Sequence, residues 1–187
     1  MGEKLYAVEV GELEVEHNNQ TQEDVIRVGA SAVCMTVEND VEEAKKYVKN
    51  LMCTTTNCEL WECIDTHAAD DVFIIQPDCQ NGRLFGVKIF KVEQDDKEQI
   101  ADHTFVFVIA DEVITAQQLA IQYQKEKTGD SLWNVAEGTP IENVEGWLVN
   151  PCIEDNKWKI KLEPSVKLES FSRLKAEKKI AMAVEKK

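Results

Sequence analysis

The sequence predicts an α+β protein that contains two diverged copies of a strand-strand-helix-strand unit with a mainly antiparallel sheet, followed by an amphipathic C-terminal helix. Three observations predict this fold. Apolar and polar residues alternate in two similar segments, apolar residues recur at helical spacing after each of them, and an Asn-x-Glu-x-Trp pattern follows each helical stretch. The predicted parts are a first repeat at residues 1–82, a second repeat at 83–164 and a basic helix within 165–187.

The first two strands of each copy are expected to form a hairpin. Residues 4–10 resemble residues 83–89 in their alternation, and each segment is followed by a polar turn. Turns of this composition connect antiparallel strands. The turns are expected at residues 17–20 and 94–97, and the returning strands at 25–28, extending toward Val33, and at 105–109.

A helix is expected after each hairpin. Asn39 and Thr115 are the expected N-caps, and aligning them pairs Ala44 with Ala120. The two helices would then share one inward face. The apolar residues at helical spacing are Val41, Ala44, Val48 and Leu51 in the first copy and Ala116, Leu119, Ala120 and Tyr123 in the second.

Each copy is expected to end in two further strands. Residues 57–63 match residues 143–149 in the spacing of Asn, Glu and Trp, which pairs Trp61 with Trp147. Apolar segments at residues 72–75 and 158–162 are expected to form the fourth strands.

The chain resembles a group of uncharacterised two-repeat α+β proteins encoded by gut Bacteroidetes and their phages. The resemblance covers residues 4 to about 150 and is carried by Val28 and Ala30 before the first helix and by Val108 and Ala110 before the second. No activity is established for that group. The resemblance therefore implies an origin in such a bacterium or phage and implies no mechanism.

The net charge of −14 bears on the expected partners. A strongly acidic body repels phosphate backbones, so direct binding of nucleic acid is not expected. No apolar stretch approaches the roughly 20 residues that span a bilayer, and the first residues do not have the pattern of a Sec-type signal. The six cysteines are therefore expected as free thiols in the cytoplasm, or in a virion if the chain is a phage structural protein.

Four residues have a spacing within the range of CCCH zinc fingers, namely Cys53, Cys58, Cys63 and His67. The alignment of the two copies argues against a zinc site, because Cys58 and Cys63 take the places of Val144 and Val149. Two thiols five residues apart also point to opposite faces of a strand. We therefore expect buried, apolar cysteines and no metal or cofactor, with zinc binding as the alternative.

Two histidines, one of them His67, lie near carboxylates in the sequence. His67 precedes Asp70 and Asp71, and His103 follows Asp102. A general base needs an oriented neighbour and a nucleophile or metal, and no GxSxG, HExxH, P-loop or GxGxxG motif supplies one. We expect these side chains in solvated loops.

The first strand carries a row of carboxylates at Glu12, Glu14 and Glu16. Such a row can imitate the phosphates of nucleic acid, and it is also typical of the solvated face of an antiparallel sheet. Trp61 and Trp147 could stack on bases, but their recurrence favours a place in the core.

The C-terminal segment is predicted to form an amphipathic helix that docks on the acidic body of the same chain or in a groove of a partner. The residues expected to make these contacts are Phe171, Leu174 and Ala181 with Arg173, Lys175 and Lys178.

These observations predict a non-enzymatic protein-interaction or assembly module, such as a structural or accessory protein of a phage, that binds other protein subunits or further copies of itself. The C-terminal helix and the acidic first strand are the expected contact surfaces. Two alternatives stay open, namely an acidic nucleic-acid mimic that inhibits a host enzyme and a zinc-dependent accessory protein of nucleic-acid processing.

Overall fold

The computed structural model describes residues 2–18, 23–69, 73–92, 100–165 and 168–184, except for some side chains at the ends of these segments. The chain divides into two compact units, each of which is described by itself. The first consists of Met1–Ala68 with Val166–Lys187, and the second of Ala69–Ser165.

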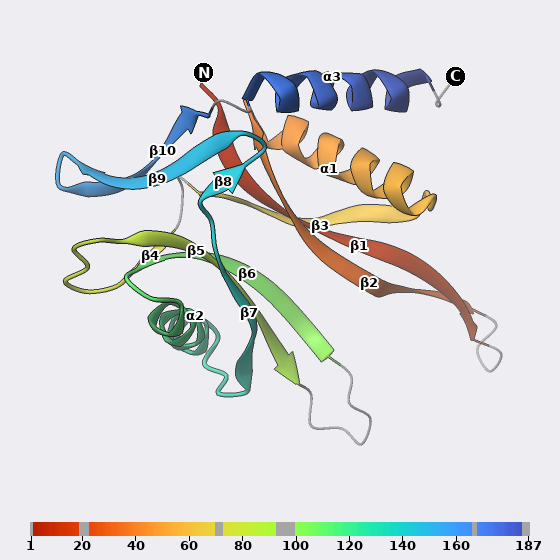
Figure 1. The fold of residues 1–187 in the computed structure, drawn as a ribbon. Helices are drawn as coiled ribbons and strands as arrows, with labels where there is room; N and C mark the ends of the chain where they lie inside the picture. Colours follow the sequence, from red (N-terminus) through yellow and green to blue (C-terminus); the bar gives the residue numbers. More distant parts are fainter. Residues whose placement is uncertain (1, 19–22, 70–72, 93–99, 166–167, 185–187) are drawn as a thin grey trace. The chain divides into compact units, whose positions relative to one another are not determined.

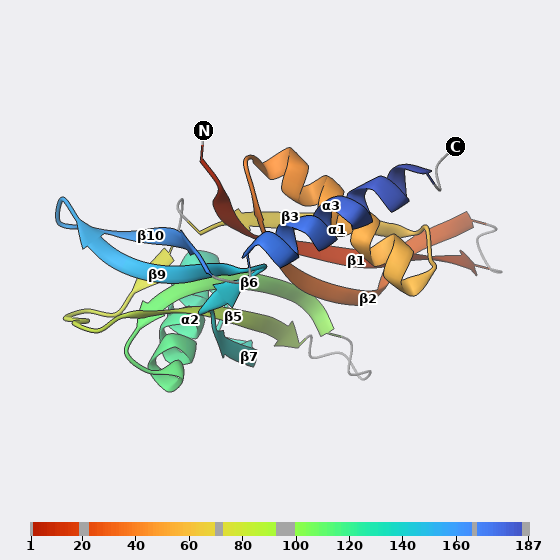
Figure 2. The ribbon, with the colours of Figure 1, turned by 45° about the horizontal axis from the view of Figure 1, so that its top comes forward.

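The first unit is a three-stranded antiparallel sheet with two helices (Figure 1). The strand order is β2-β1-β3, and α1 covers one face of the sheet. The elements are β1 (Lys4–Asn18), β2 (Glu23–Glu38), α1 (Val41–Thr56), β3 (Trp61–Ala68) and α3 (Leu168–Val184). Figure 2 shows α3 beside α1, in agreement with the contacts between the two helices.

The second unit contains two sheets and one helix. One sheet has the order β4-β6-β5-β7, in which only β4 runs parallel to its neighbour, and the other has the order β10-β9-β8. The elements are β4 (Phe73–Ile75), β5 (Arg83–Val92), β6 (Ile100–Ala110), α2 (Val113–Thr128), β7 (Trp133–Pro140), β8 (Asn143–Val144), β9 (Trp147–Glu154) and β10 (Lys157–Pro164).

The predicted fold class is confirmed as α+β with mainly antiparallel sheets and a C-terminal helix. Both units contain a hairpin, a helix of 16 residues and a third strand on the other side of the first strand, giving the orders β2-β1-β3 and β6-β5-β7. A common origin of the two units stays a prediction. The apolar segment at residues 72–75, expected as the last strand of the first copy, contributes β4, which pairs with β6.

The helices begin at other residues than the sequence analysis predicted. The carboxylate of Asp40, not Asn39, caps α1 and accepts a hydrogen bond from the backbone N–H of Glu43 at 2.9 Å. Helix α2 follows Glu112, which makes no side-chain cap, so that Thr115 lies inside the helix. Capping by a side chain requires an extended residue just before the helix, and Thr115 is not in that position.

Each helix packs on one face of its sheet through small and aromatic residues. In the first unit Ala44, Tyr47 and Val48 of α1 contact alternate residues of β1 and Trp61. In the second unit Ala116 of α2 holds the place of Ala44, since each is the fourth residue of its helix. The predicted pairing of Ala44 with Ala120 is therefore wrong by one helical turn.

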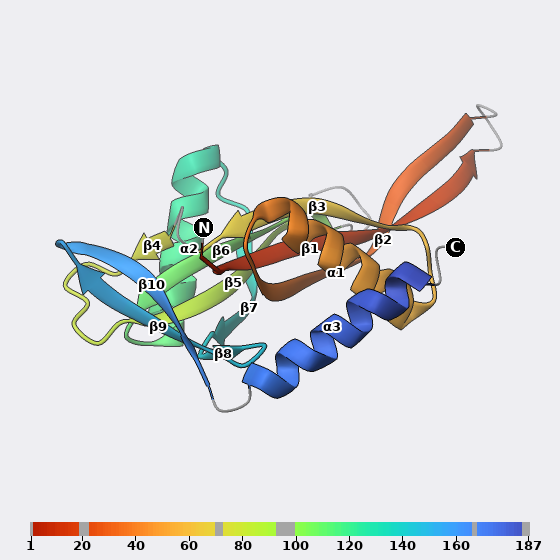
Figure 3. The ribbon, with the colours of Figure 1, turned by 90° about the horizontal axis from the view of Figure 1, so that it is seen from above.

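The hairpin of β1 and β2 continues past the end of β3. Strand β3 pairs with β1 only up to Trp61, which lies opposite Glu12. The remaining two-stranded part, residues 13–18 and 23–28, is called the arm, and Figure 3 shows it extending beyond β3. Gly11 lies at its base, where a Cβ atom would be 2.6 Å from Cγ1 of Val28. The side chain of Val28 fills the space that a Cβ atom would take, so a glycine fits here.

Within the part of the chain that the structure describes, no helix is both long enough and apolar enough to cross a membrane.

Candidate functional site

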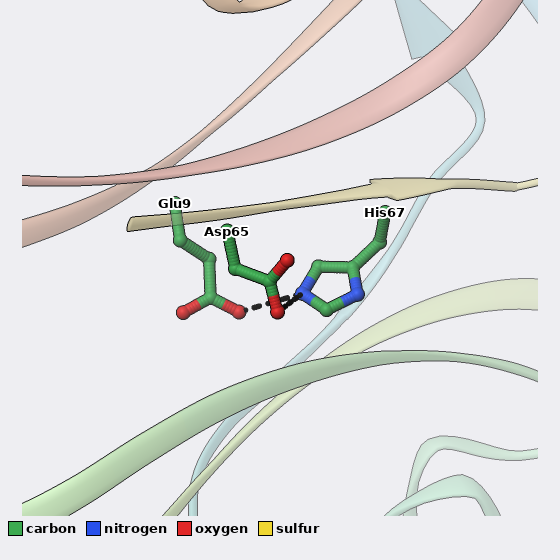
Figure 4. Close-up of side chains that lie close together, drawn as sticks. All are labelled: Glu9, Asp65 and His67. Atoms are coloured by element: carbon green, nitrogen blue, oxygen red, sulfur yellow. Dashed lines mark hydrogen bonds and ion pairs between the residues drawn. The ribbon is translucent and has the colours of Figure 1, made fainter. Parts of the chain in front are cut away.

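Two carboxylates and one imidazole meet on the sheet of the first unit. Val8 and Val10 pack against α1, so Glu9 between them points to the opposite face of β1. Asp65 and His67 of β3 point to the same side (Figure 4). The group of Glu9, Asp65 and His67 is called the carboxylate–histidine cluster below.

The carboxylate–histidine cluster is compact. Nε2 of His67 lies 2.8 Å from Oε1 of Glu9 and 3.5 Å from Oδ2 of Asp65. The three ligand atoms all lie within 4.8 Å of one another. The side chain of Glu9 is only 9% exposed, whereas that of Asp65 is 59% exposed. The cluster is therefore closed on one side and open on the other.

A bulge in β3 creates this arrangement. The register shifts between Glu9, which lies opposite Asp65, and Val10, which lies opposite Cys63. Trp61 and Cys63 pack against α1, and strict alternation would place Asp65 on that same face. The additional residue, Ile64, reverses the alternation and brings Asp65 to the face of Glu9.

The cluster concentrates negative charge on one spot of the sheet. Like charges directly opposite each other on neighbouring strands are destabilising. In the second unit, where β5 and β7 have a shift at the same place, Lys88 lies opposite Glu137. The cross-strand pair has opposite charges there, whereas in the first unit the two opposed residues are both carboxylates and Nε2 of His67 lies beside each of them.

The CCCH candidates are distributed over different elements. Cys53 lies in α1 and Cys58 follows that helix, where its Sγ donates to Glu12 at 3.1 Å. Cys63 lies in β3 and donates to the carbonyl of Lys45 at 3.4 Å, and burial raises the pKa of its thiol. Within the described ranges these thiols and His67 do not bring three ligand atoms together as the carboxylate–histidine cluster does.

The histidines expected in loops lie in strands. His67 is part of β3, and His103 is part of β6, opposite Phe90. Asp102 also lies in β6, whereas Asp70 and Asp71 are outside the described residues. The prediction of loop positions for the two histidines is therefore wrong, because the strands extend further than their apolar residues indicate.

The carboxylates of β1 have different surroundings. Glu12 accepts the hydrogen bond from Cys58 and Glu14 is exposed. Glu16 belongs to β1, but its side chain lies outside the described part. Glu9, which precedes the row in the sequence, is buried and bonded to His67.

Helix α3 contacts the first unit through a basic residue. Nζ of Lys175 donates to Oγ1 of Thr36 at 3.0 Å and to the carbonyl of Val37 at 2.9 Å. It also pairs with Oε1 of Glu38 at 3.0 Å and lies over the ring of Tyr47. The contact thus joins α3 to the end of β2 and to α1.

The other predicted contact residues of α3 whose side chains are described take no part in the contacts of Lys175. Phe171 and Leu174 are exposed, Arg173 pairs with Glu177 of the same helix, and Lys178 is exposed. Ala181 lies in α3, and its side chain is outside the described part.

Comparisons with family models, with curated proteins and with solved structures found no match for this chain.

Proposed function

We propose that this protein is a non-enzymatic assembly module and that two copies associate through the arm. The apolar face of the arm is the observation that carries this proposal. Leu13 lies opposite Val28, and Val15 lies opposite Ile26. Val15 is 61% exposed and Ile26 is 64% exposed. Contiguous apolar side chains that face solvent are typical of interaction sites.

The length of the arm supports the same proposal. A hairpin of two strands is marginally stable in water unless another element covers its apolar face. Over residues 13–18 β1 has β2 as its strand partner but no longer β3. A partner that covers the arm would therefore supply the packing that a stable two-stranded ribbon needs.

A second copy suits this face in charge and in symmetry. His17 and Asp24, which continue the face toward the turn, are bonded to each other at 2.8 Å. Glu14 lies on the other face, since it alternates with the apolar residues. Two arms related by a twofold axis would cover each other with apolar side chains and would leave Glu14 in solvent.

Phe171 and Leu174 of α3 form a second exposed apolar site, three residues apart on one side of the helix. This site is available for a further protein subunit in the proposed assembly.

Light scattering coupled to gel filtration tests the role of the arm. We expect the wild-type chain to have about twice the chain mass of 21.2 kDa at micromolar concentrations. The Val15→Lys and Ile26→Lys variants should elute as single chains, because a lysine in the apolar face would be buried without a partner. Glu14→Lys is the control, since it places the same lysine side chain on the other face.

The result that would overturn the proposal is a wild-type protein of single-chain mass at every concentration measured. Salt separates the proposal from the alternative of a nucleic-acid mimic. Association through apolar faces should persist as ionic strength rises, whereas binding of a basic partner by carboxylates should weaken steeply.

A further inference from the structure

We infer that Glu9, Asp65 and His67 form a binding site for one divalent first-row transition-metal ion. One imidazole nitrogen and two carboxylate oxygens are ligands that such ions share in proteins. The residues differ from those of the CCCH pattern except for His67, and the site is separate from the arm that carries the proposed assembly function.

The distances between the ligand atoms suit a metal. Bonds of about 2.1 Å from one ion to each ligand place neighbouring ligand atoms about 3.0–3.5 Å apart in octahedral or tetrahedral geometry. The two distances from Nε2 of His67, 2.8 Å to Glu9 and 3.5 Å to Asp65, lie close to this range. Small movements of the side chains would admit an ion between them.

The charges of the cluster also favour a cation. Nε2 of His67 carries at most one proton and can donate it to one carboxylate at a time. A divalent ion between the three ligand atoms would contact both carboxylates at once and would place two positive charges against their two negative charges. The low exposure of Glu9 adds to this preference, because a buried carboxylate requires compensation.

The ligands are held in place by their surroundings. Oδ1 of Asp65 accepts a hydrogen bond from the backbone N–H of Thr66 at 2.7 Å, which leaves Oδ2 turned toward His67. Glu9 and His67 project from paired strands of one sheet. Such support orients ligands before the ion arrives. The exposed side chain of Asp65 leaves room for water molecules to complete the coordination.

Titration with Mn²⁺ tests the inference. Mn²⁺ is chosen because carboxylate ligands suit it, whereas Zn²⁺ would also bind the free cysteines. The full-length chain is treated with chelator, dialysed and titrated with MnCl₂ by calorimetry. We expect one Mn²⁺ per chain, and we expect Glu9→Gln, Asp65→Asn and His67→Gln each to weaken binding at least about tenfold.

The matched control is Glu12→Gln, which removes a carboxylate from the same strand outside the cluster and should leave the affinity unchanged. Circular dichroism verifies the fold of each variant, and Mn²⁺ should raise the melting temperature of the wild type but not of Asp65→Asn. Asp65 is exposed, so this variant should fold even if Glu9→Gln does not. Absence of saturable Mn²⁺ binding to the wild type, or equal affinities of the wild type and Asp65→Asn, would overturn the inference.

Discussion

The indole N–H groups of Trp61 and Trp133 each donate to a threonine hydroxyl at the end of the preceding helix. The distances are 2.8 Å from Trp61 to Thr56 and 3.0 Å from Trp133 to Thr128. Each hydroxyl in turn donates to a carbonyl of the last helical turn. In both units the threonine side chain thereby links the end of the helix to the first residue of the next strand.

Replacing Thr128 with valine should destabilise the second unit by about 1–3 kcal/mol, because the indole N–H of the buried Trp133 would lose its acceptor. Unfolding in urea, followed by circular dichroism, measures this change. Thr128→Ser retains the hydroxyl and is the control. Equal midpoints for the valine and serine variants would contradict the prediction.

Trp133 is the residue that the sequence analysis missed. It opens β7 as Trp61 opens β3, whereas Trp147 opens β9 in another sheet. The predicted pairing of Trp61 with Trp147 is therefore wrong. The Asn-x-Glu-x-Trp match was misleading because polar residues around an exposed turn recur without structural equivalence. The informative signal was the spacing Thr-x4-Trp after each helix, which the two units share.

The correction leaves the interpretation of Cys63 in place. Cys63 lies opposite Val10 after the register shift, and Val135 lies opposite Ile89 after the corresponding shift in the second unit. A valine thus still holds the equivalent position, which is consistent with Cys63 as a small apolar residue in contact with the core.

At the scale of elements, an ion pair with little exposure to solvent contributes to the attachment of α3. The side chain of Lys175 is 16% exposed and that of Glu38 is 6% exposed. Removal of one partner from a buried ion pair leaves the other charge buried without compensation. The resulting loss of stability is larger than the net stabilisation that the intact pair provides.

The Lys175→Met variant keeps most of the side-chain stem and removes the charge. We expect it to lower the free energy of unfolding of the first unit by about 3 kcal/mol. Addition of Glu38→Gln should restore part of this loss. Thermal unfolding compares these variants with Lys178→Met, an exposed position of the same helix that should change stability by less than about 0.5 kcal/mol. Equal effects at the two lysines would refute the assigned attachment.

The loop between β4 and β5 is attached to the start of α2 by another set of contacts. Asp111 accepts hydrogen bonds from Sγ of Cys79 at 3.3 Å and from the backbone N–H of Asn81 at 3.3 Å. Its other oxygen accepts from Gln76 at 3.0 Å. Burial, together with the hydrogen bond and the charge of Asp111, raises the pKa of Cys79 to about 11.

This shift predicts a pH dependence of stability. The ordinary pKa of the thiol is 9.0, so the folded state holds its proton to a higher pH than the unfolded chain does. The stabilisation is complete below about pH 9 and is lost as the pH rises through 11. Cys79→Ser keeps a hydrogen-bond donor and does not titrate. The urea midpoint of the wild type should therefore fall more than that of Cys79→Ser as the pH rises from 9 to 11. Parallel curves would contradict the prediction.

The carboxylate–histidine cluster shows why a site can escape prediction although its strand is recognised. Asp65 and His67 are two residues apart, the spacing that places side chains on one face of a strand. Glu9 lies on β1, which is distant from these two residues in the sequence. The bulge at Ile64 decides which face Asp65 takes, and nothing in the apolar pattern marks that additional residue.

At the scale of the whole molecule, the predicted class and most elements follow from two simple periodicities. The alternation of apolar and polar residues predicts the strands, and apolar residues at helical spacing predict the two internal helices. Both patterns arise because one face of each sheet is buried against one face of its helix. The association of elements was harder to predict. The sequence of a short apolar segment such as β4 does not tell which unit it joins. Its pairing with β6 depends on packing against residues that are distant in the sequence.

The first unit is assembled from both ends of the chain, with Ala69–Ser165 between its two segments. The bond from Lys175 to Val37 spans 138 residues. During synthesis, β1, β2, α1 and β3 leave the ribosome before α3 is made. Glu38 therefore cannot form its ion pair with Lys175 until α3 has been synthesised. A chain that stops before α3 would have a complete second unit and an incomplete first one, so the synthesis of α3 completes the first unit.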